Sequence, residues 1–165
     1  MEELVRRAQQ GDAVAVEALL RELSPYVGRI CGAIALDAAD DAMQEALVAI
    51  FKHIGSLREP AALMGWVRRI AVREAVRMAQ GGRAIPVDPD YLHAASALSV
   101  PDSATEVEVR EVLAALAPAQ RAVLTLRHFE GLDEEEMVGV LDVAAGTVKS
   151  RLHRARAAFR ERWTA

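Results

Sequence analysis

The sequence predicts an all-α protein made of two small helical domains joined by a flexible linker. Hydrophobic residues make up 52% of the 165 residues, enough to build a core, while aromatic residues contribute only 4%. Ala, Leu and Arg are abundant, which favours helices over strands. Residues 81–104 contain three prolines and two glycines between helical patterns, so we expect a linker between domains at 1–80 and 105–165.

Two amphipathic helices are predicted in the first domain. Apolar side chains at helical spacing define the buried face of the earlier helix: Met43, Leu47, Ile50 and Ile54. A break follows at residues 55–57, and Pro60 suits the first turn of the next helix. That helix is expected to bury Leu63, Val67 and Ile70, while its opposite stripe carries an aromatic ring followed by three guanidinium groups: Trp66, Arg69, Arg73 and Arg77.

The second domain is predicted to contain four helices. Capping boxes are expected at Ser103 with Glu106 and at Asp133 with Glu136. Pro118 is expected to open a helix that stops near Gly131. The apolar positions of these helices predict their inward faces: Val109, Val112, Leu113 and Leu116, then Val123 and Leu126, then Val148, Leu152, Ala155 and Phe159.

Charge separates sharply along this second domain. Every charged residue from 130 to 142 is acidic, whereas residues 147–165 carry six Lys and Arg against one Glu. An acidic helix, a tight turn at 142–144 and a basic helix from Ala145 form the pattern of a DNA-binding helix-turn-helix. The alternative is a solvated basic face on a terminal helix, which the preceding turn makes the weaker interpretation. The overall net charge of -4 does not oppose DNA binding, because the local patch meets the phosphates.

Several functional classes find no support in the residues. The single cysteine, Cys31, allows no intramolecular disulfide and is expected to be a buried thiol. The four histidines are scattered, so we assign no metal and no cofactor. We find no nucleophile with a base and no phosphate-binding loop, so we expect no enzyme. Neither a signal peptide nor a long apolar run is present, which predicts a cytoplasmic protein that does not insert into membranes.

Two segments carry a family resemblance. Residues 146–156, Gly-Thr-Val-Lys-Ser-Arg-Leu-His-Arg-Ala-Arg, resemble the promoter-reading helix of the extracytoplasmic function (ECF) group of sigma-70 factors, and residues 116–131 resemble the helix that precedes it in region 4. Residues 40–45 resemble the acidic polymerase-binding motif of region 2, and residues 65–71 resemble its Trp-containing helix. The resemblance extends from about Leu4 to Trp163, with the two regions in the family's order.

The resemblance implies a non-enzymatic, bacterial transcription initiation factor with three sets of contact residues. RNA polymerase core would be bound by Asp40, Asp41, Gln44, Glu45 and Lys52. The minus-ten promoter element would be contacted by His53, Arg58, Trp66, Arg69, Arg73 and Arg77. The minus-thirty-five element would be contacted by Thr147, Lys149, Ser150, Arg151, Arg154 and Arg156, some on base edges and others on phosphates. The resemblance further implies control by an anti-sigma factor and a monomer when free.

Other interpretations stand beside these assignments. Asp40 and Asp41 also suit the N-terminal turn of any helix, and packing in the core is favoured over base contact for Trp66. The chain departs from the family pattern at Val138, at Asp142 in place of the turn glycine, and at Ala42, Ala46 and Ala49. The first domain carries ten basic and eleven acidic residues, which leaves open weak promoter melting or a need for a partner.

Two other functions fit parts of the sequence. A conventional helix-turn-helix regulator would bind an operator through residues 105–163, but such proteins bind palindromes as dimers, and no dimerisation helix is evident. A sigma-like binder would occupy an anti-sigma factor or polymerase without opening promoters. Promoter sequence, inducing signal and regulon do not follow from these residues.

Overall fold

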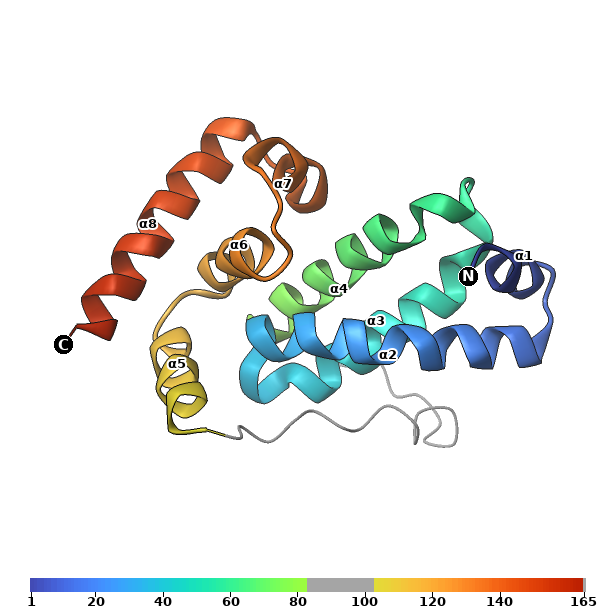
Figure 1. Ribbon diagram of the computed structural model, residues 1–165, viewed down its shortest axis with the longest axis horizontal. Coiled ribbons are helices and arrows are strands. Elements are labelled where there is room, and N and C mark those ends of the chain that lie inside the picture. Colours follow the sequence, from blue (N-terminus) through green and yellow to red (C-terminus); the bar gives the residue numbers. More distant parts are fainter. Residues whose placement is uncertain (83–102, 165) are drawn as a thin grey trace.

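The computed structural model describes residues 1–82 and 103–164, and these residues form helices joined by short turns (Figure 1). No strand occurs in this part of the chain, which confirms the all-α prediction. The predicted linker falls mostly on residues 83–102, which lie outside the described residues. The α-helices are α1 (Glu2–Gln9), α2 (Ala13–Ala35), α3 (Ala39–His53), α4 (Leu63–Ala79), α5 (Ala104–Ala114), α6 (Pro118–His128), α7 (Glu134–Leu141) and α8 (Ala145–Trp163), with single 3-10 turns at Leu36–Ala38, Ile54–Ser56 and Pro60–Ala62.

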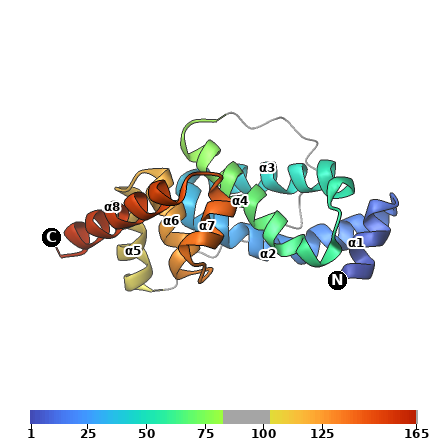
Figure 2. The same cartoon turned by 90° about the horizontal axis from the view of Figure 1, so that it is seen from above.

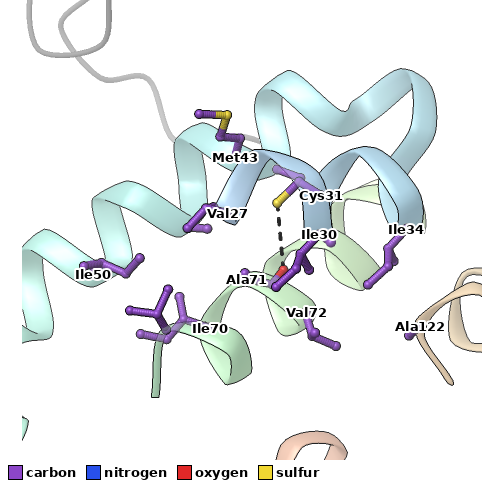
Figure 3. Close-up of a cluster of buried hydrophobic side chains, with 14 of the residues drawn as sticks. Val27, Ile30, Cys31, Ile34, Met43, Ile50, Ile70, Ala71, Val72 and Ala122 are labelled. Carbon is purple, nitrogen blue, oxygen red and sulfur yellow. Dashed lines mark hydrogen bonds between the residues drawn. The ribbon is translucent and has the colours of Figure 1, made fainter. Parts of the chain in front are cut away.

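Helix α2 is the central element of the first domain. Asp12 caps it, because its carboxylate accepts hydrogen bonds from the backbone N–H groups of Val14 and Ala15 at 3.0 and 3.1 Å. Helices α1, α3 and α4 all pack against α2, and α3 also packs against α4. The apolar stripes predicted for α3 and α4 are buried as expected, with Ile50 and Val67 fully inaccessible to solvent. Figure 3 shows side chains of α2, α3 and α4 meeting in this core.

Cys31 lies inside this core and is fully buried. Its Sγ lies 4.0 Å from the carbonyl oxygen of Ala71, to which it donates a weak hydrogen bond (Figure 3). Burial, with a smaller contribution from the charge of Glu74, raises the pKa of the Cys31 thiol to about 12. The thiol is therefore protonated and shielded near neutral pH.

We expect the folded protein to resist thiol alkylation. At pH 8 a thiol with a pKa near 12 is ionised in only about one molecule in ten thousand, and the thiolate is the reactive form. Iodoacetamide should leave Cys31 unmodified in buffer and modify it completely in denaturant, as mass spectrometry would measure. Rapid modification in buffer would contradict the buried placement.

The helix ends of the second domain follow the predicted signals. Pro118 occupies the first turn of α6, and Gly131 has the positive φ of 69° that a left-handed turn requires. Asp133 and Glu136 form the predicted capping box, with both hydrogen bonds at 2.8 Å. At Ser103, the hydroxyl accepts from the backbone N–H of Glu106 at 3.2 Å.

One predicted inward face is less buried than expected. In α5 no residue is fully buried: Val109, Val112 and Leu113 remain half-buried, and only Leu116, just beyond the helix, is in the core. The reason is that α5 packs mainly against a single neighbour, α8, so little of the described chain covers its apolar positions. The other predicted positions, Val123, Leu126, Val148, Leu152 and Ala155, are buried, whereas Phe159 is half-buried and stacks on Trp163.

The two domains contact each other directly. Helix α6 packs against α2 and α4, and α7 packs against α4. Helix α8 packs against α5, α6 and α7 and lies at the edge of the molecule in both views (Figures 1 and 2). The arrangement leaves the outer face of α8 open to solvent.

Candidate nucleic-acid and polymerase interface

Helix α8 has one apolar face and one charged face. Val148, Leu152 and Ala155 pack against the rest of the second domain and are at most 2% exposed. Lys149, Ser150 and Arg154 are exposed on the same helix, at positions outside the buried stripe. The geometry therefore holds a row of donors on a rigid helix with nothing in the described chain covering it.

The other residues predicted for this surface differ in exposure. Arg156 is exposed, but Thr147 and Arg151 are half-buried at the flank of the apolar face. The Ser150 hydroxyl donates to the carbonyl of Thr147 at 3.2 Å, and Arg154 Nε donates to the carbonyl of Ser150 at 3.3 Å. These contacts are local to α8, and they leave the ends of the Lys149 and Arg154 side chains free to reach a ligand. His153 is also exposed on this helix, although the sequence did not single it out.

The turn before α8 has the geometry that a helix-turn-helix needs. Asp142 follows α7 in the left-handed conformation, with φ 53° and ψ 48°, where a glycine is more usual. Asp is one of the few other residues that tolerate this region, so the departure at this position keeps the turn. Val138, the other departure in this motif, is half-buried and packs against the core. The acidic residues of the first turn of α7, at positions 134–136, suit the positive end of its dipole.

Helix α4 presents part of its predicted stripe to solvent. Arg69 and Arg73 are exposed, while Trp66 is half-buried and packs against the core, as the packing interpretation expected. Arg77 is held by carboxylates: its Nε donates to Glu74 at 2.7 Å and its Nη2 to Glu45 at 3.2 Å. Arg73 also pairs with a carboxylate, since its Nε donates to Glu74 at 3.1 Å, although its side chain remains exposed. The stripe is therefore split between two exposed arginines, one of them paired, and two partly buried side chains, Trp66 and Arg77.

Glu45 is placed differently from the other residues predicted to bind polymerase. It is only 5% exposed and pairs with Arg77 across the contact between α3 and α4. Glu74, 8% exposed, joins this network through Arg73 and Arg77. Its position three residues before Arg77 is a usual spacing for a helical ion pair, which is the signal that could have revealed it. The network fixes the two helices against each other and leaves Glu45 turned inward.

The remaining residues predicted to contact polymerase or the minus-ten element lie at the surface of the first domain. Asp40 and Asp41 are exposed in the first turn of α3, and Gln44 is half-buried one turn later. Lys52, His53 and Arg58 are exposed at the far end of α3 and in the loop that follows. Acidic and basic groups thus occupy opposite ends of the same helix.

The described residues contain neither a metal-binding cluster nor a membrane-spanning helix. No group of three or more His, Cys, Asp or Glu side chains in residues 1–82 and 103–164 is arranged to hold a metal ion. Among the helices of these same ranges, none combines the length and the apolar character that crossing a membrane demands.

Both domains match known families. Residues 15–84 match the family described as Sigma-70 region 2, and residues 106–159 match the family described as Sigma-70, region 4. The first match contains most of α2 and all of α3 and α4. The second contains α7 and most of α8, which form the helix-turn-helix.

Full-length relatives and solved structures agree with these matches. The chain is 32% identical to the RNA polymerase sigma-H factor of Pseudomonas aeruginosa, over 96% of this chain and 91% of that protein. It is 30% identical to the ECF RNA polymerase sigma-E factor of Escherichia coli K12, over 94% of this chain and 90% of that protein.

The fold resembles CnrH in its complex with the cytosolic domain of CnrY, with a TM-score of 0.65, 20% identity and coverage of 97% of this chain and 94% of that one. It also resembles the sigma factor RpoE from Bartonella quintana in its complex with the anti-sigma factor NepR, with a TM-score of 0.55, 20% identity and coverage of 96% and 98%. Since region 2 and region 4 occur here in order, and relatives align over almost the whole chain, this protein belongs to the ECF group of the sigma-70 family and is an alternative sigma factor.

Proposed function

We propose that this protein binds RNA polymerase core and directs it to promoters whose minus-ten and minus-thirty-five elements it contacts through separate domains. The observation that carries the proposal is the outer face of α8, where Lys149, Ser150 and Arg154 are exposed on a helix fixed by its buried side. Binding polymerase and promoter DNA requires no reaction catalysed by this protein, so we propose a non-enzymatic function that needs no cofactor. The protein would act as a monomer in the cytoplasm, where RNA polymerase works.

In the second domain, α8 would enter the major groove at the minus-thirty-five element. Lys and Arg recognise guanine edges and phosphates, and both kinds of contact need exposed side chains of this length. Arg154 and Lys149 are the strongest candidates because both are exposed and neither forms an ion pair among the described residues. Arg156 is exposed as well and lies two turns after Lys149 on the same side of α8, so it is a further candidate for a base or a phosphate contact.

In the first domain, Arg69 and Arg73 with the loop residues His53 and Arg58 would contact the minus-ten element. Guanidinium groups beside a separated strand neutralise its phosphates, and aromatic or polar groups hold its bases. Trp66 would serve mainly as packing beneath this surface, because the core covers part of its ring. Arg77 would act as a positioning residue that holds α4 against α3.

Polymerase core would bind the surface formed by Asp40, Asp41, Gln44 and Lys52. Exposed carboxylates and amides steer and specify partners more than they contribute raw affinity. Glu45 would support this surface from below, through its pair with Arg77.

An anti-sigma factor is a further proposed partner. Two structural relatives were solved as complexes, CnrH with the cytosolic domain of CnrY and RpoE with the anti-sigma factor NepR. By analogy, a partner of this class would silence the present protein until a signal releases it.

Neutralising the two exposed aspartates at the start of α3 is expected to weaken core binding about tenfold. The variant is Asp40→Asn with Asp41→Asn, which keeps side-chain size and removes two charges from the proposed interface. The measurement is fluorescence anisotropy of labelled protein titrated with purified core. The matched control, Glu17→Gln with Glu22→Gln, removes two exposed charges from α2 and should bind like the wild type. Equal affinity of both variants would reject the proposed interface.

A further inference from the structure

We propose that helix α1 is part of the promoter-reading surface of the first domain, because Gln9 holds the turn at Ile54–Ser56 in one conformation. Gln9 would be a positioning residue that acts on DNA only through the exposed side chains beside this turn. The role rests on the proposed function, in which His53 and Arg58 contact the minus-ten element, but the hydrogen bonds of Gln9 belong to the fold itself. The region 2 match begins at residue 15, after α1, and so assigns no role to this helix.

The Gln9 carboxamide spans both ends of the turn. Its Nε2 donates to the carbonyl oxygen of Leu57 at 2.7 Å and to that of Ile54 at 3.1 Å. Ile54 opens the turn and Leu57 directly follows it, so one side chain ties the two ends together. The Ile54 carbonyl also accepts the turn's own hydrogen bond, from the backbone N–H of Leu57 at 3.2 Å. Helix α1 accordingly lies beside the segment that joins α3 to α4 (Figures 1 and 2).

Helix α1 is anchored on its other sides, so it can act as a fixed support for the turn. Val5 and Ala8 are buried, at 0% and 4% exposure, and α1 packs against α2. Arg7 binds the capping residue of α2 with two hydrogen bonds, from Nε and Nη2 to Asp12 Oδ2 at 2.9 and 2.6 Å. Gln9 is the last residue of α1 and is half-buried between this anchored helix and the turn.

The turn presents different groups on its two sides. Ile54 and Leu57 are each only 7% exposed and pack in the core, whereas Gly55, Ser56 and Arg58 are exposed. The carbonyls that Gln9 binds belong to the two buried residues, so the carboxamide holds the turn from its protein side. The exposed side of the turn therefore stays open to a ligand.

A further hydrogen bond restrains the exposed side. Ser56 Oγ donates to the carbonyl oxygen of His53 at 2.7 Å, which ties the turn to the last residue of α3. His53 precedes the turn and Arg58 follows Leu57, so the two side chains proposed to contact DNA lie on either side of one restrained segment. Fixing the turn therefore fixes the positions from which both side chains extend.

A turn of this size needs such support if it is to distinguish one base from another. A 3-10 turn has poorer hydrogen-bond geometry than an α-helix and seldom persists beyond a few residues. A recognition site must hold its groups within about 0.5 Å of the productive geometry. A loop that is ordered before DNA arrives also avoids the entropic cost of ordering on binding. We therefore expect Gln9 to determine how well bases of the minus-ten element are discriminated, and to leave core binding unchanged.

Three variants of the full chain separate this role from general effects. Gln9→Glu replaces the donating NH2 group with an oxygen and keeps the shape of the side chain. Gln10→Glu makes the same change, with the same added charge, at the adjacent and exposed glutamine, and is the matched control. Gln9→Met removes the donor without adding any charge.

Hydrogen exchange of the free protein, measured by NMR, tests whether Gln9 holds the turn. The Leu57 amide should exchange about tenfold faster in Gln9→Glu and in Gln9→Met, because two hydrogen bonds that favour the closed turn are lost. Amides in the middle of α2 should exchange as in the wild type, and Gln10→Glu should match the wild type throughout. An unchanged Leu57 amide would overturn the proposal, and so would equal acceleration across the whole domain, which indicates general destabilisation.

Transcription with purified core tests whether the turn reads bases. The template is a promoter fragment on which the wild type initiates, together with single-base substitutions in each of its two elements. A wrong base typically costs about tenfold or more in specific binding. We expect both Gln9 variants to reduce this discrimination to about threefold or less at the minus-ten element and to leave it unchanged at the minus-thirty-five element. Gln10→Glu should discriminate as the wild type does at both.

The ratio between promoters distinguishes positioning from mere stability. A destabilised protein has a smaller active fraction, which lowers initiation at every promoter in the same proportion and leaves the ratios unchanged. Unchanged ratios in the Gln9 variants, despite faster exchange at Leu57, would therefore overturn the positioning role. Failure of the wild type to initiate on any fragment would instead reject the proposed function, and the exchange measurement would still decide whether Gln9 holds the turn.

Discussion

Replacing Lys149 and Arg154 together by alanine is expected to weaken binding of the polymerase holoenzyme to its promoter by about thirtyfold or more. Each contact of a Lys or Arg with a base edge contributes about 1–3 kcal/mol, so two lost contacts exceed one order of magnitude in affinity. Both side chains are exposed on the outer face of α8, and neither supports the core. The variant should therefore fold normally while losing its promoter.

The affinity is measured by filter binding over a series of salt concentrations. If both residues also release counterions, the slope of log affinity against log salt should fall by about two. The matched control is Arg160→Ala with Arg162→Ala, which removes two exposed charges from the end of the same helix. We expect a small, sequence-independent loss there. Equal losses for the two variants would mean that charge alone, and not the predicted reading face, determines binding.

Replacing Arg121 by methionine is expected to lower the free energy of unfolding by about 2–4 kcal/mol. Methionine keeps most of the apolar stem but leaves the buried carbonyls of Ile34 and Leu116 without their donor, and each orphaned acceptor costs about 1–3 kcal/mol. The residue is 6% exposed, so water cannot readily replace the guanidinium. Urea unfolding followed by circular dichroism measures the change.

Arg110→Met is the control for this experiment. Arg110 also joins the two regions, through a 3.2 Å bond to Asp37, but both side chains are well exposed. An exposed pair contributes at most about 1 kcal/mol. A similar loss in both variants, or no loss at Arg121, would show that burial does not set the strength of these contacts.

The helices were predictable because their signals are local. Pro118, the Asp133 capping box and Gly131 act within a few residues, and each acts as predicted. The apolar stripe of α3 is equally local, since a 3.6-residue period is enough to define it. The face of α5 was predicted less well, because the burial of Val109 and Val112 depends on how much neighbouring structure reaches that helix.

Side-chain pairing was less predictable than secondary structure. Glu45 and Arg77 were expected to serve different partners, yet they bind each other, although 32 residues separate them in the chain. The hydrogen bonds among Tyr26, Arg68 and Glu130 join residues that are even farther apart in the sequence, since 104 residues separate Tyr26 from Glu130. A single sequence carries no periodic or capping signal for such pairs. Only the packing of region 4 onto region 2 brings them together.

Run-off transcription measures whether this protein gives RNA polymerase its promoter specificity. Purified core polymerase is supplied with a library of promoter fragments, with and without the protein. We expect selective initiation at a small set of fragments that share spaced minus-ten and minus-thirty-five elements, and loss of this initiation in the Lys149→Ala, Arg154→Ala variant. Binding to core without initiation at any fragment would show that the protein does not direct promoter opening, and would favour a sigma-like binder.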